Sequence, residues 1–176
     1  MHFGNIKEFS IENGPGVRVS LFVSGCRNHC PGCFSSHTWD FTYGLPYTEE
    51  ITEEIIRLLK PDYMEGLTIL GGEPMEPENQ ADLIPVLKRI REACPGRSIW
   101  CYTGFTWEEL HGASRGNTPH REELLSLIDV LVDGRFAESQ RNLSLAFRGS
   151  ENQRILDVKK SLAAGAAVWW EKGGAR

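Results

Sequence analysis

The sequence lacks an excess of basic residues. Its 19 lysines and arginines are outnumbered by 24 aspartates and glutamates, which leaves a formal net charge of −5. Proteins that bind long stretches of nucleic acid usually present a basic face to the phosphates. We therefore expect no nucleic acid among the partners of this protein.

The sequence also lacks a long hydrophobic run. The longest apolar stretch, residues 163–170, contains Gly165 and is far shorter than the roughly 20 residues that span a bilayer. The first residues include no apolar segment that would serve as a secretion signal. We therefore expect a cytoplasmic protein with no membrane partner.

Cysteine is scarce and unevenly distributed. Three of the five cysteines fall within eight residues, at Cys26, Cys30 and Cys33, whereas Cys94 and Cys101 stand alone. An odd number in this arrangement does not resemble the disulfide framework of a small secreted domain. We expect Cys94 and Cys101 to be buried free thiols, because free cysteine packs as a small apolar side chain. In a reducing compartment, the three clustered thiols suggest a metal site.

Length and composition indicate one globular domain. The chain has 176 residues, 40% of them hydrophobic and 24% charged, and no internal repeat. We expect a single domain over residues 1–158. It is followed by a tail, residues 159–176, whose structure the pattern does not indicate.

Strand-like and helix-like patterns alternate along the chain and predict an α/β fold. Apolar residues recur with period two from Val17 to Val23, which predicts a first strand. The other expected strands are residues 67–70, 98–102, 129–132 and 153–158, and the expected helices are 49–59, 79–93, a short one opened by a Thr106–Glu109 capping box, and 122–128. Such alternation predicts a parallel sheet with helices packed outside it.

The chain is too short for a complete eight-fold barrel of about 250 residues, so we expect a partial, open β/α barrel. Ligands of parallel sheets bind at the carboxyl ends of the strands. The cysteine loop follows the first predicted strand, and Gly71-Gly72 follows the next. Both segments are therefore expected at the same end of the sheet.

The spacing of Cys26, Cys30 and Cys33 would place them on one stripe of a helix. Pro31 and Gly32 oppose that interpretation, and a helix would spread the three sulfurs over about 10 Å. A strand would turn Cys33 to the opposite face from the other two. An irregular loop that wraps the three thiols around one object is the arrangement left.

Soft sulfur ligands select zinc or an iron–sulfur cluster. Structural zinc takes four ligands, so a zinc site would need His29 or His37 to complete a Cys3His set. The residues alone leave that alternative open.

A second motif, Gly71-Gly72-Glu73-Pro74, follows a predicted buried strand. Its glycines allow backbone groups to approach a ligand, and the carboxylate of Glu73 offers hydrogen-bond acceptors that suit an amine. Gly and Pro also punctuate ordinary strand-to-helix turns, which is the alternative interpretation.

The spacing Cys-x3-Cys-x2-Cys resembles the signature of the radical S-adenosylmethionine superfamily. Further motifs sharpen the resemblance, and they occur in this order: Asn13-Gly-Pro-Gly16, residues 21–26, Cys30-Pro-Gly-Cys33, Gly71-Gly-Glu-Pro74, residues 100–104, residues 129–134 and residues 147–153. Together, over residues 8–157, they resemble the activating proteins of anaerobic ribonucleoside-triphosphate reductases. One departure from the superfamily is Gly32, which stands where an aromatic residue commonly precedes the third cysteine.

The resemblance implies that Cys26, Cys30 and Cys33 hold one 4Fe-4S cluster, with the fourth iron left open to S-adenosylmethionine. Gly71-Gly72-Glu73-Pro74 would receive the amino group of that molecule. The residues implied or considered as its contacts are Gly32, Cys33, Phe34, Gly71, Gly72, Glu73, Thr103, Ser150 and Asn152. Arg18 and Arg148 could meet a carboxylate, although we expect surface ion pairs at both.

The resemblance also implies the reaction. The reduced cluster would cleave S-adenosylmethionine to methionine and a 5′-deoxyadenosyl radical, which would generate a glycyl radical on the large subunit of the anaerobic reductase. A flavodoxin-type protein is the electron donor that the family implies. No catalytic side-chain acid or base is required. The alternatives are a related radical enzyme for another glycyl-radical protein or a small molecule, and a non-catalytic zinc module.

Overall fold

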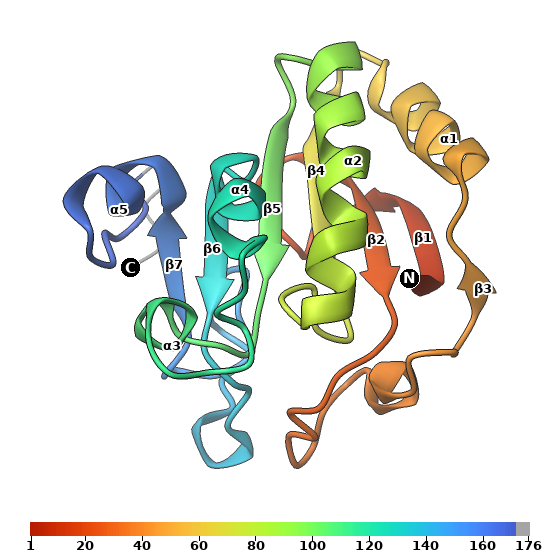
Figure 1. Ribbon diagram of the computed structural model, residues 1–176. Helices are drawn as coiled ribbons and strands as arrows, with labels where there is room; N and C mark the ends of the chain where they lie inside the picture. Colours follow the sequence, from red (N-terminus) through yellow and green to blue (C-terminus); the bar gives the residue numbers. More distant parts are fainter. Residues whose placement is uncertain (172–176) are drawn as a thin grey trace.

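The computed structural model describes residues 1–171 of the chain and contains one mixed sheet (Figure 1). Its strand order is β3-β1-β2-β4-β5-β6-β7. The strands are β1 (His2–Ser10), β2 (Val17–Val23), β3 (Leu45–Pro46), β4 (Met64–Gly71), β5 (Ser98–Tyr102), β6 (Val130–Asp133) and β7 (Arg154–Asp157). Strands β2, β4, β5 and β6 are parallel, and the sheet is open. The predicted α/β class with an open sheet is confirmed.

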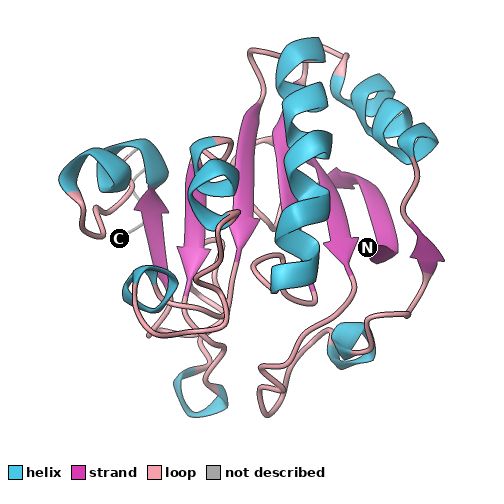
Figure 2. Ribbon diagram, viewed as in Figure 1, coloured by secondary structure: helices cyan, strands magenta, loops and turns pink. Residues whose placement is uncertain are grey.

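Helices accompany the parallel strands, as expected for this class (Figure 2). They are α1 (Glu49–Leu59), α2 (Pro77–Ala93), α3 (Trp107–His111), α4 (Arg121–Ser126) and α5 (Val158–Ala164), with short 3-10 turns η1 (Ser36–Trp39) and η2 (Glu138–Gln140). The predicted capping box forms at the start of α3, where the hydroxyl of Thr106 accepts from the amide of Glu109. A side-chain cap also starts α5, where Asp157 accepts from the amide of Lys160.

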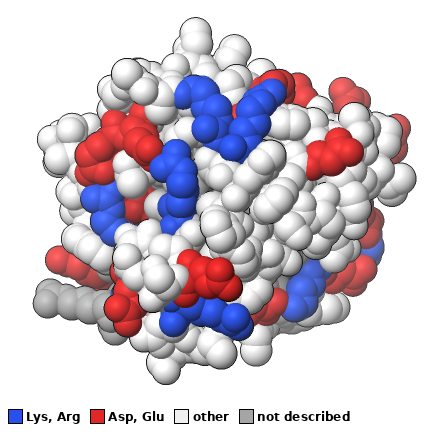
Figure 3. All heavy atoms as spheres, turned by 90° about the horizontal axis from the view of Figure 1, so that it is seen from below, with Lys and Arg blue, Asp and Glu red and all other residues white. Residues whose placement is uncertain are grey.

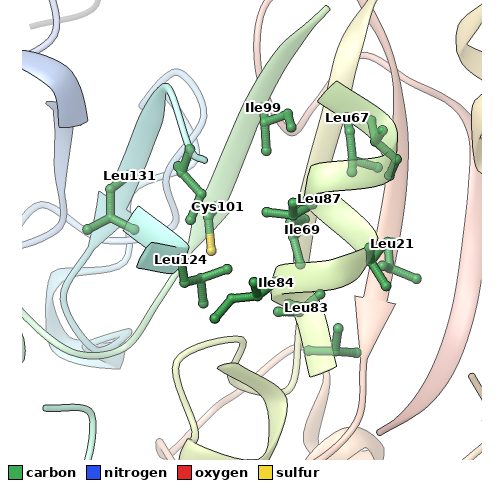
Figure 4. Close-up of a cluster of buried hydrophobic side chains, with 14 of the residues drawn as sticks. Leu21, Leu67, Ile69, Leu83, Ile84, Leu87, Ile99, Cys101, Leu124 and Leu131 are labelled. Carbon is green, nitrogen blue, oxygen red and sulfur yellow. The ribbon is translucent and has the colours of Figure 1, made fainter. Parts of the chain in front are cut away.

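The two faces of the sheet differ because side chains alternate along each strand. On one face, apolar side chains of the strands pack against α2 and α4 and form the main core (Figure 4). Cys101 lies in this core and Cys94 is also buried, so both are the buried free thiols that the sequence predicted. The other face carries a smaller cluster of Trp100, Val130, Val132 and Ile155.

The predicted parallel sheet is found at the centre, and the strands that flank it on its two sides are antiparallel to it. Strand β1 precedes the predicted first strand and pairs with it antiparallel, while β7 runs antiparallel to β6. The short β3 extends the β1 edge. β1 escaped detection because it has only partly buried or exposed residues along most of its length and so lacks an apolar alternation. The cysteine loop thus follows β2, which is the first strand that the sequence predicted.

Arg18 is buried in the sheet, and the expectation of a surface ion pair was wrong. Its guanidinium donates to the hydroxyls of Thr68 (2.7 Å) and Ser98 (2.9 Å) and to the carbonyls of Leu67 and Ser98. It also lies over the ring of Trp100. Burial lowers the pKa of this guanidinium to about 10. Arg18 therefore ties β2 to β4 and β5 through neutral acceptors.

The predicted tail, residues 159–176, begins inside α5. After α5 the chain returns along β7, where the amide of Asp157 donates to Val168 and that of Trp170 donates to Ile155. The ring of Trp170 packs edge-on against Trp100. Residues 172–176 of the tail lie outside the described residues. Within residues 1–171, no helix is both long and apolar enough to cross a membrane.

Candidate functional site

Four loops meet at the carboxyl ends of the parallel strands, at the lower end of the sheet in Figure 1. The cysteine loop, residues 24–35, follows β2, and we call it the cluster loop. The turn of residues 72–76 follows β4, Thr103-Gly104 follows β5, and residues 134–136 follow β6. The sheet therefore brings together the segments that the sequence placed at strand ends.

The cluster loop is irregular, as predicted. His29 and Gly32 both have left-handed backbone conformations, with φ of 47° and 70°. Between them the chain makes a tight turn, in which the amide of Cys33 donates to the carbonyl of Cys30 at 3.1 Å. These reversals keep the cysteines off both a helix and a strand.

All three cysteines of the cluster loop line one cavity of about 540 Å³. Cys26 is buried, which raises the pKa of its thiol to about 11, although the backbone amides of Asn28 and His29 oppose the rise. Burial also raises the pKa of Cys30. Because metals bind the thiolate form, metal uptake here must release protons.

Residues from the sheet and from several loops complete the cavity. Its wall includes Glu12, Asn13, Phe22, Asn28, Phe34, Trp39, Leu70, Gly71, Gly72, Glu73, Tyr102, Thr103, Gly104, Phe136, Leu143 and Phe147. Seen from this end of the molecule, charged side chains lie around a broad area that carries none (Figure 3). The cavity thus combines thiols, backbone at the Gly71-Gly72 turn and apolar rings, the mixture typical of cofactor sites.

The Gly71-Gly72 turn is locked against the start of the cluster loop. The amide of Gly72 donates to the carbonyl of Val23, and the amide of Glu73 donates to the carbonyl of Gly25, both at 2.8 Å. A Cβ atom on Gly72 would lie 2.6 Å from the Gly25 oxygen. Only glycine permits this close approach without a backbone shift.

Glu73 is fully enclosed, and protein donors surround its carboxylate. It accepts from the amide of Met75, the hydroxyl of Thr103, the amide of Gly104 and the side-chain amide of Asn28, at 2.7–2.9 Å. Burial raises the pKa of this carboxyl to about 7, against the opposing effect of the hydrogen bonds. The acceptors that the sequence offered to an amine ligand are thus engaged in joining three loops.

Sequence reasoning missed a second buried carboxylate at the site. Glu76 accepts from both the amide and the guanidinium of Arg27 at 2.8 Å and from the guanidinium of Arg115 at 3.1 Å. Arg115 also donates to the side-chain oxygen of Asn28. No motif marks these residues, because their partners lie 39 to 87 positions away along the chain.

Of the other residues predicted to contact the ligand, some line the cavity and others do not. Phe34 lines the cavity and packs against Phe136, with ring centroids 5.3 Å apart. Gly32, Ser150 and Asn152 are absent from the described wall of the cavity. The buried hydroxyl of Ser150 accepts from the amide of Ala137, and the side chain of the exposed Asn152 donates to the carbonyl of Arg135.

The sequence predicted a surface ion pair at Arg148. Within the described part of the chain, Arg148 makes no ion pair. Its guanidinium donates to the carbonyl of Gln153 at 2.6 Å. Arg148 nevertheless lines the cavity.

The imidazoles considered as zinc ligands pack on aromatic rings. His29 stacks on Trp39 and His37 packs edge-on against Tyr43, at 4.6 and 5.0 Å between ring centroids. Within residues 1–171, no three His, Cys, Asp or Glu side chains converge closely enough to hold a single metal ion. What this cavity offers a metal is sulfur from three positions of one loop, the donor chemistry of iron–sulfur clusters.

Comparison with known proteins agrees with this chemistry. A family model described as a 4Fe-4S single cluster domain matches residues 12–156. The anaerobic ribonucleoside-triphosphate reductase-activating protein of Escherichia coli strain K12 is 39% identical over 157 residues, which cover 88% of this chain and 97% of the relative. Proteins of the same name from Pasteurella multocida and Enterobacteria phage T4 are 42% and 32% identical, over 82% and 88% of this chain and 90% and 93% of their own lengths. The chain therefore belongs to the family of the anaerobic ribonucleoside-triphosphate reductase-activating proteins.

Proposed function

We propose that this protein is a radical S-adenosylmethionine enzyme that activates an anaerobic ribonucleoside-triphosphate reductase. When bound, a 4Fe-4S cluster would supply the electron that cleaves S-adenosylmethionine, and the resulting 5′-deoxyadenosyl radical would take a hydrogen atom from a glycine of the reductase. Cys26, Cys30 and Cys33 would hold the cluster. The product would be a stored glycyl radical on the large subunit.

The observation that carries the proposal is the shared cavity. The three loop cysteines and the Gly71-Gly72 turn line the same space, whose volume of about 540 Å³ lies within the roughly 300–1,000 Å³ of small-molecule sites. Three thiols leave one iron of a 4Fe-4S cluster without a protein ligand. A cosubstrate in this cavity would therefore lie beside that iron.

The remaining side chains of the cavity would bind and orient rather than catalyse. Phe22, Leu70 and Phe147 provide apolar wall, and so do the rings of Phe34, which follows the third cysteine, and of Phe136, which packs on Phe34. Backbone at Gly71-Gly72 is the expected partner of the methionine end. Ser150 and Asn152 stay predictions as contacts. We assign no side chain a role as acid or base.

The proposed partner follows from the names of the relatives, which are activating proteins of anaerobic ribonucleoside-triphosphate reductases. We propose the large subunit of such a reductase as the substrate and a flavodoxin-type protein as the electron donor. We also propose that residues 1–158 act as one domain and that the protein works in the cytoplasm.

The test is anaerobic reconstitution with iron and sulfide, followed by reductant, S-adenosylmethionine and the reductase. We expect an electron paramagnetic resonance doublet from a glycyl radical on the reductase. Cys30→Ser should abolish the signal, whereas Cys94→Ala, at a buried thiol far from the cavity wall, should leave it. Cleavage of S-adenosylmethionine without a radical on the reductase would reject the proposed substrate. One zinc per chain, without iron or sulfide, would reject the proposed chemistry.

A further inference from the structure

The segment between the first two cysteines has little backbone structure of its own. Among residues 1–171, the backbone groups of residues 27–32 join a single backbone–backbone hydrogen bond, from Cys33 to Cys30. His29 in addition holds a left-handed conformation that costs energy for a residue with a side chain. Something outside the backbone must therefore hold this segment in place.

Two buried carboxylates provide that restraint. Glu76, which has no exposed surface, accepts from the Arg27 amide and guanidinium, and Glu73 accepts from the side chain of Asn28. Both glutamates belong to the turn between β4 and α2. Side-chain hydrogen bonds thus join the segment to the turn that follows Gly71-Gly72.

A third element reaches the segment from a distant part of the chain. Arg115 lies between α3 and α4, and its guanidinium contacts both the Glu76 carboxylate and the side-chain oxygen of Asn28. The guanidinium also lies over the ring of Phe105, 4.7 Å from its centroid. The next residue, Gly116, is held by the buried side chain of Gln80, which donates to its carbonyl at 2.8 Å. Arg115 thus bridges the start of α2 and the cluster loop from a position that its neighbours hold in place.

The planar guanidinium suits this double contact. The Nε of Arg115 donates to the carboxylate and its Nη2 donates to an amide oxygen, two separate donors in a fixed plane that a lysine ammonium does not offer. Because Asn28 donates to Glu73 through its nitrogen, the Arg115 contact also fixes which end of the Asn28 amide points toward Glu73. Loss of Arg115 would leave the side-chain oxygen of Asn28 without this donor and Glu76 with one guanidinium instead of two.

We propose that Arg115 is a positioning residue, which holds the Arg27–Asn28 segment of the cluster loop through Asn28 and Glu76 and so sets where Cys26 and Cys30 present their sulfurs. This inference rests on the proposed function for its consequence, retention of the cluster. Its structural part, the restraint on the loop, concerns residues of this chain alone and can be measured without the cluster.

The experiment compares Arg115→Met with Arg91→Met. Arg91 is a matched control, because its half-buried guanidinium pairs with Asp129 and donates to the carbonyl of Leu127 at the opposite end of the sheet. Hydrogen exchange is measured at the amides of Arg27 and Asn28 in the metal-free chain. Iron release to a chelator is measured in the reconstituted protein, together with its iron and sulfide content.

For Arg115→Met we expect about tenfold faster exchange at Arg27 and about tenfold faster iron release, the change expected when a hydrogen bond to a charged group is lost. Arg91→Met should lower the midpoint of thermal unfolding about as much as Arg115→Met does. It should change neither the exchange rate at Arg27 nor the rate of iron release. Arg115→Lys should restore only part of the restraint. Because Arg115 acts partly through Asn28, Arg115→Met should speed iron release by a smaller factor in an Asn28→Ala background than in the wild-type chain.

Equal exchange at Arg27 in Arg115→Met and Arg91→Met would overturn the inference, whatever the cluster does. A wild-type protein that takes up no iron and sulfide would instead overturn the proposed function, while faster exchange in Arg115→Met would still support the restraint. The two failures are therefore distinguishable.

Discussion

Each end of the sheet contains a buried ionisable side chain that joins several segments, but the segments differ in kind. At the amino end, the buried cation Arg18 joins β2, β4 and β5 through hydroxyls and carbonyls of regular strands. At the carboxyl end, the buried carboxyl group of Glu73 joins the cluster loop, its own turn and the Thr103-Gly104 segment. The Arg18 guanidinium thus holds strands of the sheet together, whereas the Glu73 carboxyl group holds together the loops of the candidate site.

The largest effect on folding is expected from Arg18→Met. It removes at least four hydrogen bonds and leaves buried acceptors at Thr68, Leu67 and Ser98, so the free energy of unfolding should fall by about 3–4 kcal/mol. Urea unfolding of the metal-free chain measures the change. The folded fraction should still take up the same iron per chain, and a loss of iron without a loss of stability would contradict the division between the two ends.

Glu73→Gln should have a smaller effect on folding and a larger one on the site. Glutamine keeps the shape but turns one acceptor into a donor that faces other donors, so we expect a loss of about 1–3 kcal/mol in the free energy of unfolding. Iron and sulfide per chain should fall, because Asn28 and Gly104 lose their shared acceptor. Full cluster content with unchanged unfolding would show that Glu73 does not join the loops as we describe.

Gly72→Ala tests the backbone contact at the same end. The new Cβ would meet the carbonyl oxygen of Gly25 at 2.6 Å, so the turn and the cluster loop must separate, at an expected cost of about 1–3 kcal/mol in stability. Gly96→Ala is the control, because a Cβ there meets no atom of the described residues within 4 Å. Equal unfolding free energies and equal iron contents in the two variants would rule out the close approach as a requirement.

Asn152→Ala should have the smallest effect. Its side chain is exposed and, among residues 1–171, donates only to the carbonyl of Arg135, so we expect less than about a twofold change in the dissociation constant for S-adenosylmethionine. Equilibrium binding to the reconstituted protein measures this. A tenfold or greater loss of affinity would place Asn152 in the site after all.

The comparison of the two ends also explains what the sequence could predict. The parallel strands and the cysteine loop were readable, because alternation in Val17–Val23 and the Pro31-Gly32 break are local signals. Strand β1 was not readable, because most of its side chains lie at or near the surface at a sheet edge. The direction of β7 depends on how the chain returns to β6, which no local pattern specifies.

Within the candidate site, the proposed ligands were easier to predict than the residues that support them. Cys26, Cys30 and Cys33 stand out by type and spacing, and the structure brings them to one cavity. Arg18 and Arg115 look like surface charges in the sequence, because their hydrogen-bond partners come from strands and loops far along the chain. A charged residue whose partners lie so far along the chain leaves no signal that a single sequence can show.

We propose that the carboxyl end of the sheet brings an iron–sulfur cluster and S-adenosylmethionine into one cavity. The most direct measurement is electron–nuclear double resonance on the reduced, reconstituted protein with S-adenosylmethionine carrying nitrogen-15 in its amino group. We predict a hyperfine coupling between the cluster and the labelled nitrogen. A reduced 4Fe-4S cluster that shows no coupling to saturating labelled S-adenosylmethionine would contradict a shared cavity.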